Sequence, residues 1–152
     1  MKPKTPQPIK NGHENLSSEL KNIIDLKGNI AQPAKVLYEV MSDHFEKEEK
    51  YALPPLSFLL ALSKGNWEIN SNEAIKMADK LKSKLAELTQ DHENILKSLE
   101  DLEVMAEAEN NAPAKQFVKN LRIHAEVEDQ VLYPTTILIG NYLKNIKLHQ
   151  EI

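Results

Sequence analysis

Four histidines and two glutamates recur along the chain in an ordered pattern that suits metal binding. Two of the histidines carry a glutamate four residues later, and residues four apart lie on one face of a helix. Imidazole and carboxylate together suit iron, manganese or zinc, and the chain has no cysteine to supply a thiolate. The candidate metal ligands, in chain order, are His13, His44, Glu48, His92, His124 and Glu128.

The two His-x-x-x-Glu pairs lie within an internal repeat. Residues 33–54 and 113–134 align without a gap and are identical at seven positions. Unrelated segments of this length would agree at about one or two positions, so the similarity marks a repeated structural unit. Each copy therefore predicts a helix that brings one imidazole and one carboxylate to a common centre.

Helical patterns separated by proline, glycine and capping residues must position these side chains. Few glycines and long Leu/Lys/Glu/Ala tracts indicate an all-α chain, and the order of its helices predicts an up-down-up-down four-helix bundle. Residues 1–9 are expected to form a flexible tail and residues 10–152 a single domain. The four long helices are expected over 10–27, 33–51, 71–108 and 113–132, with a short extra helix between the second and third and a tail helix over 136–148.

Local signals predict where these helices begin and end. Gly28 suits the residue after the first helix, and Asn70 with Glu73 three residues later suits the start of the third. Pro54 and Pro134 are expected to end the second and fourth helices, since proline disrupts a helix interior.

The candidate ligands fall on the apolar seams of these helices, where leucine would otherwise lie. The third helix has apolar residues at alternating spacings of four and three, and His92 takes one of these places. On the fourth helix the expected seam is Phe117, Leu121, His124, Glu128 and Val131. At 1.5 Å per residue, the offsets from the connecting turns are small enough for all four histidines to meet at one level.

Each of these residues taken alone has a simpler interpretation than a metal site. A lone core histidine is usually a packing residue, a lone His-x-x-x-Glu pair is usually solvated, and the six polar groups could pair with one another in a plain bundle. The coincidence of four histidines on four seams at one level favours metal.

Further polar residues near the pairs have separate expectations. Glu46 and Glu126 lie on the far faces of their helices and are expected in solvent, as is His149 near the end of the chain. Glu49 and Asp129 are candidates for outer hydrogen-bond partners, and Asp129 is also an alternative to Glu128 as the bridging carboxylate.

Composition excludes several other classes of function. The net charge of −4 and pI of about 5.8 give no basic surface for nucleic acid or an anionic membrane. The N-terminal residues have no apolar core of a secretory signal, so we expect a cytoplasmic protein. The apolar run 52–62 is too short to span a membrane. It is interpreted as a cap over one end of the bundle or, within residues 52–67, as a surface for a protein partner or self-association.

The chain resembles the haemerythrin-like family, specifically its HHE cation-binding domains. The motifs that carry this resemblance are "NGHENL" around His13, "HFEKEEKYALPPL" from His44, "QDHENIL" around His92 and "HAEVEDQVLYP" from His124. Together they cover roughly residues 10–135. The resemblance implies a four-helix bundle that holds two non-haem iron ions with an oxo or hydroxo bridge, with Mn or Zn as alternatives. It further implies that His13 and His44 serve one iron, that His92 and His124 serve the other, and that Glu48 and Glu128 bridge them.

At two positions this chain has a different residue from other members of the family that it resembles. The oxygen carriers of the family add a histidine one turn after the third, where this chain has Leu96. Some family members have a glutamate directly after the second-helix histidine, where this chain has Phe45. One iron should therefore have an open coordination position for an exogenous molecule.

These observations predict a non-haem dinuclear iron protein that reacts with or senses dioxygen, peroxide or nitric oxide. The alternative is a regulatory or interaction module that metal stabilises and that turns nothing over.

Overall fold

The computed structural model describes residues 2–66 and 70–150, and these residues form helices and connecting turns without strands. The elements are α1 (Gln7–Asp25), α2 (Ala31–Lys47), the π-helical turn η1 (Glu48–Ala52), the 3-10 turn η2 (Pro54–Phe58), α3 (Leu59–Ser63), α4 (Asn72–Ala108), α5 (Ala112–Val127), the π-helical turn η3 (Glu128–Leu132) and α6 (Tyr133–Gln150). Among these, no helix is long and apolar enough to cross a membrane. A cytoplasmic location stays a prediction.

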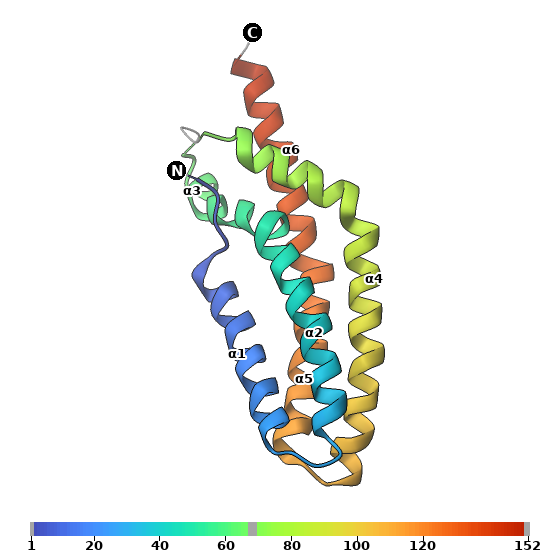
Figure 1. The fold of residues 1–152 in the computed structure, drawn as a ribbon. Coiled ribbons are helices and arrows are strands. Elements are labelled where there is room, and N and C mark those ends of the chain that lie inside the picture. Colours follow the sequence, from blue (N-terminus) through green and yellow to red (C-terminus); the bar gives the residue numbers. More distant parts are fainter. Residues whose placement is uncertain (1, 67–69, 151–152) are drawn as a thin grey trace.

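Four helices form the predicted bundle. Helix α1 packs against α2 and α5, and α4 packs against the same two helices from the other side. The four run side by side along the molecule, and α1 begins and α6 ends toward the same end of it (Figure 1). The all-α fold, the short extra helix and the tail helix are therefore confirmed.

The bundle has two apolar clusters rather than one. The first lies toward the turns that join α1 to α2 and α4 to α5, and includes Leu20, Leu37 and Phe117. The second consists of buried side chains from η1, η2, the first half of α4 and α6, and includes Phe58, Leu88 and Tyr133. The buried histidines and glutamates come from the stretches of helix between these two clusters, so apolar side chains shield them on both sides.

The ends of the helices follow local signals, with corrections at three positions. Helix α1 ends at Asp25 with Leu26 as its C-cap, so the residue after it is Lys27, one position before the expected Gly28; both have positive φ angles. However, α1 begins at Gln7 with proline in its first turn, three residues earlier than predicted. The prediction of Asn70 as an N-cap is wrong, because α4 begins after Ser71, which makes no side-chain capping bond. The flexibility of residues 1–9 stays a prediction.

Two π-helical turns, one in each copy of the repeat, distinguish the structure from the predicted regular helices. The amide of Leu53 donates to the carbonyl of Glu48 over 2.9 Å, and the amide of Tyr133 donates to Glu128, both across five residues. The prediction that Pro134 ends a helix is wrong, since η3 runs directly into α6. A proline ring clashes with the carbonyl four residues earlier in an α-helix, and the wider π-turn just before Pro134 relieves that clash.

The extra residue in η3 shifts which side chains face the core. Val131, expected on the seam, is 52% exposed, whereas Tyr133 is 1% exposed. A π-turn adds one residue to the helical repeat, so the seam advances by one position after Glu128.

The segment after η1 covers one end of the bundle. Leu53, Leu56 and Phe58 are buried in the second apolar cluster, which supports the interpretation as a cap. Leu59 and Leu60 face outward and are 47% and 66% exposed. Trp67, at the end of the proposed partner surface 52–67, lies outside the described residues, and that surface stays a proposal.

Candidate metal centre

The six candidate ligands meet at one level of the bundle, as their positions along the helices predicted. Five of them are buried, and the side chain of His124 is 19% exposed. The six side chains come from α1, α2, η1, α4, α5 and η3. The internal repeat thus supplies its two glutamates from the π-turns and its two histidines from the helices just before them.

The ligand atoms form two groups that share both glutamates. The His44–His92 group consists of His44, Glu48, His92 and Glu128, and the His13–His124 group consists of His13, Glu48, His124 and Glu128. Within each group, one ligand atom per residue lies within 4.8 Å of all the others. Each group could hold one metal ion, and together they offer a dinuclear centre with two shared carboxylates.

The grouping differs from the pairing that the family resemblance implied. His13 was expected to share a metal with His44, and His92 with His124. In the structure, the imidazoles that lie together come from different hairpins, His13 of α1 with His124 of α5 and His44 of α2 with His92 of α4. Ring centroids are 5.1 Å apart for His13 and His124 and 4.5 Å apart for His44 and His92.

Each histidine turns its Nε2 atom toward the shared carboxylates. Glu48 Oε1 lies 3.2 Å from Nε2 of His44 and 3.7 Å from Nε2 of His13. Glu128 lies 3.1 Å from Nε2 of His92 and 3.2 Å from Nε2 of His124. Of the two candidates Glu128 and Asp129, it is therefore Glu128 that lies at the centre together with Glu48.

The alternative bridging residue, Asp129, lies outside the centre with two other carboxylates. Asp129 Oδ1 is 2.9 Å from Nδ1 of His92, and Asp91 Oδ2 is 3.1 Å from Nδ1 of His44. Glu49 approaches Nδ1 of His13 at 3.6 Å. Such outer carboxylates hold the imidazole ring in orientation and leave Nε2 free for a metal. Glu49 and Asp129 lie where outer partners were expected, whereas Asp91 was not foreseen, although it directly precedes His92.

Replacing Asp91 by asparagine should weaken metal binding by about 10–100-fold, because loss of an outer carboxylate lowers the basicity and fixation of the ligating imidazole. Titration of the metal-free variant with Zn²⁺ against a competing chelator measures this change. Glu93→Gln is the matched control, since Glu93 lies two residues away on the exposed face of α4. Equal affinities of the two variants would contradict the positioning role of Asp91.

Burial and mutual charge set the protonation of the two shared glutamates. Burial, and then the charge of Glu128, raise the pKa of Glu48 well above its usual value. Burial opposes the charge of Glu128 too, but its short polar contacts with Glu48 and the surrounding histidines outweigh this and hold its pKa well below the usual value. The metal-free protein therefore keeps a proton on Glu48 to a higher pH than an ordinary glutamate does.

The pKa values of the two histidines of the His44–His92 group shift in opposite directions. Burial, and then the neighbouring His92, lower the pKa of His44. Burial also opposes the charge of His92, but its contacts with Glu128 and Asp129 outweigh this and raise its pKa.

Metal binding should tighten as pH rises through the neutral range, with release of protons. Both Glu48 and His92 have raised pKa values, and both must lose a proton before they can bind a cation, whereas the lowered pKa of His44 favours its neutral form. Zn²⁺ titrations between about pH 6 and about pH 8, followed by calorimetry in buffers of different ionisation enthalpy, measure the affinity and the protons released. An affinity that does not change with pH would contradict this assignment.

Several buried polar atoms of the centre have no hydrogen-bond partner. They are Nδ1 of His13, Oε1 of Glu48 and Nε2 of His124. Buried polar atoms without partners are unfavourable in a folded protein. Two of these three, Oε1 of Glu48 and Nε2 of His124, face the interior of the cluster. A bound cation would satisfy both, so the donor set fits a metal.

Two aromatic side chains make the two groups unequal. Phe45 stacks on the His13 ring with centroids 3.8 Å apart and meets His124 edge-on at 5.6 Å. On the opposite side, the Tyr133 hydroxyl donates to Glu48 Oε2 over 2.7 Å. Phe45 was identified from the sequence as a departure from relatives, whereas Tyr133 was missed. Leu96, the other departure, packs against the first apolar cluster.

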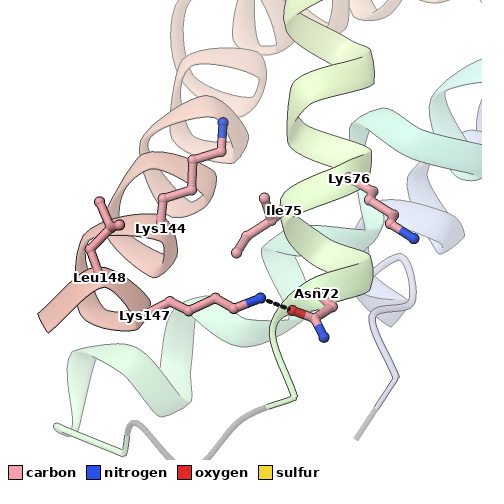
Figure 2. Close-up of a pocket in the computed structure, with 6 residues that line it drawn as sticks. All are labelled: Asn72, Ile75, Lys76, Lys144, Lys147 and Leu148. Carbon is pink, nitrogen blue, oxygen red and sulfur yellow. Dashed lines mark hydrogen bonds between the residues drawn. The ribbon is translucent and has the colours of Figure 1, made fainter. Parts of the chain in front are cut away.

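Two of the cavities in the described residues differ in their relation to the centre. One of about 690 Å³ is bordered by His13, Phe45 and Glu49 and by serines of α1 and α2. Another, of about 510 Å³, lies between the first turn of α4 and the last turns of α6 and is shown in Figure 2, where Lys147 donates to Asn72 over 2.6 Å. Asn72 precedes His92 by twenty residues on one helix, about 30 Å, so the second cavity takes no part in the centre.

A helical bundle with paired imidazole and carboxylate groups in its core defines a helical cation-binding protein. Residues 7–136 match the family model described as Hemerythrin HHE cation binding domain. This match covers most of the chain, and the chain belongs to the hemerythrin HHE cation-binding family. No curated protein and no solved structure matches it.

Proposed function

We propose that the protein binds two non-haem iron ions and presents one of them to a small exogenous molecule, namely dioxygen, peroxide or nitric oxide. The observation that carries this proposal is the pair of donor groups joined by Glu48 and Glu128, with buried donor atoms that lack partners. Imidazole with carboxylate, and no thiolate, suits non-haem iron, with manganese or zinc as alternatives.

Each residue of the centre has a distinct part in this proposal. His44 and His92 would hold one ion and His13 and His124 the other, while the shared glutamates would hold both. When bound, paired iron supplies a redox-active Lewis acid that takes up small ligands. The carboxylates of Glu49, Asp91 and Asp129 orient the imidazoles through their Nδ1 atoms. The two apolar clusters exclude water from either end of the centre.

The exogenous ligand would reach the His13–His124 group. This group borders the cavity between α1 and α2, and its aromatic neighbour is Phe45, which offers no donor atom. The other group is closed by the Tyr133 hydroxyl. This asymmetry supports the expectation of one open position and favours a place for it beside Phe45.

Loading the metal-free protein with Fe(II) without oxygen tests the proposal. Elemental analysis should give two irons per chain, and nitric oxide or air should then change the visible spectrum. His124→Gln should lose iron, whereas His149→Gln is the matched control at an exposed histidine outside the centre. A wild-type protein that takes up no iron would refute the proposal. Iron uptake with stabilisation but no response to any of the three molecules would favour the alternative of a metal-stabilised regulatory module.

A further inference from the structure

Tyr133 occupies an unusual place for a buried tyrosine. It is the first residue of α6, five residues after Glu128, and only 1% of it is exposed. Its hydroxyl donates to Glu48 Oε2 over 2.7 Å and lies 3.3 Å from Nε2 of His44 and 3.3 Å from Nε2 of His92. The ring stacks on His92 with centroids 5.7 Å apart and an interplanar angle of 15°.

The three atoms near this hydroxyl are all candidate metal donors of the same group. One hydrogen bond to Glu48 would satisfy a tyrosine whose role was only packing. Instead, the oxygen lies at nearly equal distances from the two imidazole nitrogens that face the centre. It is therefore positioned as a further oxygen donor of the His44–His92 group.

The other group has no equivalent oxygen from the repeat. The residue that corresponds to Tyr133 in the first copy, eighty positions earlier, is Leu53. The aromatic side chain at the His13–His124 group is Phe45, which has no donor atom. The chain thus builds two different metal positions from a repeated framework.

We propose that Tyr133 coordinates the metal ion of the His44–His92 group through its phenolic oxygen. This inference rests on the proposed function, since it requires a metal at that group. Coordination replaces the O–H bond by a bond from oxygen to metal, and the proton leaves to bulk water. Phenolate is a hard oxygen donor that suits ferric iron and manganese. The proposal assigns the closed position to this group and leaves the exogenous ligand to the group beside Phe45.

The test compares wild type, Tyr133→Phe and Tyr51→Phe after loading with iron and oxidation to the ferric state. Tyr51 is the matched control, because it is a buried tyrosine on η1 whose ring contacts Lys80 rather than the histidines. Elemental analysis gives the iron content, and resonance Raman spectra excited in the visible band report tyrosine ring vibrations coupled to iron.

We expect wild type and Tyr51→Phe to show a phenolate-to-iron band with enhanced tyrosine vibrations, and Tyr133→Phe to lose both. A wild-type protein with two irons per chain and no tyrosine vibrations would overturn this inference and leave the proposed function intact. A wild-type protein without iron would overturn both. Tyrosine vibrations that persist in Tyr133→Phe would also overturn the assignment.

Discussion

Replacing Glu48 by glutamine is expected to abolish metal-dependent stabilisation while leaving the metal-free protein at least as stable as wild type. Glu48 is the fully buried carboxylate common to both donor groups, so one substitution affects both metal positions. Its pKa is higher in the folded chain than in the unfolded chain, because of burial and then the charge of Glu128. Such a group binds more protons when folded, so it lowers the stability of the folded state as pH rises above its unfolded pKa.

Glutamine removes that unfavourable charge and keeps the hydrogen bonds. Its amide can still accept from the Tyr133 hydroxyl and donate to Glu128, so the geometry around it is retained. Metal at a thousand times its dissociation constant stabilises a protein by about 4 kcal/mol. For a chain of this size that corresponds to a rise in melting temperature of about 8–16 °C.

Thermal melts with and without Zn²⁺ or Fe(II) measure both parts of this prediction. Wild type should show the full rise, and Glu48→Gln should lose most of it while its metal-free melting temperature stays equal or increases. Glu46→Gln is the matched control, since Glu46 lies two residues before Glu48, at the end of α2, and is exposed. Retention of the full metal-dependent rise in Glu48→Gln would contradict the shared role of this carboxylate.

The residues of the centre could be predicted from sequence because an α-helix has a fixed period. His13, His92 and Glu128 replace apolar residues on seams, and side chains on seams must meet when the helices pack. Short turns at Gly28 and Asn110 set the relative heights of the helices, which brings the imidazoles to one level. Burial of these side chains confirms that reasoning.

The pairing of the imidazoles could not be predicted from period and height alone. Those two quantities fix the face and the level of a side chain, but each helix has two neighbours in the bundle, and face and level do not choose between them. Here α1 packs against both α2 and α5, and the ring of His124 on α5 lies 5.1 Å from that of His13. The pairing implied by the family resemblance differed from this arrangement.

The π-turn η3 explains why the sequence pattern missed Tyr133 and placed Val131 on the seam. At the regular helical period, five residues separate Glu128 from Tyr133 by about 140° around the axis, which would direct the tyrosine away from the centre. The extra residue in η3 brings Tyr133 back to the face of Glu128 and turns Val131 outward. A pattern based on the α-helical period therefore predicts Val131 on the buried face and does not predict Tyr133 there.

The position of Tyr133 depends further on how closely α6 approaches α4. Gly140 lies seven residues after Tyr133, two turns along the same face of α6. A Cβ atom built at Gly140 would overlap the Cβ of Ala78 on α4. The absence of a side chain at this position allows the two helices to pack at the distance that the structure shows.

Replacing Gly140 by alanine is accordingly expected to destabilise the protein, against the usual effect of this substitution in helices. Glycine to alanine within a helix ordinarily stabilises by about 0.5–1 kcal/mol. At Gly140 the overlap with Ala78 forces the helices apart, and overpacking of this kind costs about 1–3 kcal/mol. Chemical denaturation of the metal-free protein measures the change in the free energy of unfolding.

Two further variants separate the overlap from any other effect of alanine. Gly12→Ala is the matched control, because a Cβ at Gly12 in α1 meets nothing within 4 Å and should stabilise. In the double variant Gly140→Ala, Ala78→Gly, the clashing methyl group is removed, so much of the lost stability should return. If Gly140→Ala stabilised the protein as Gly12→Ala does, the overlap with Ala78 would be contradicted. The inference that close packing of α4 and α6 positions Tyr133 at the centre would then lose its support.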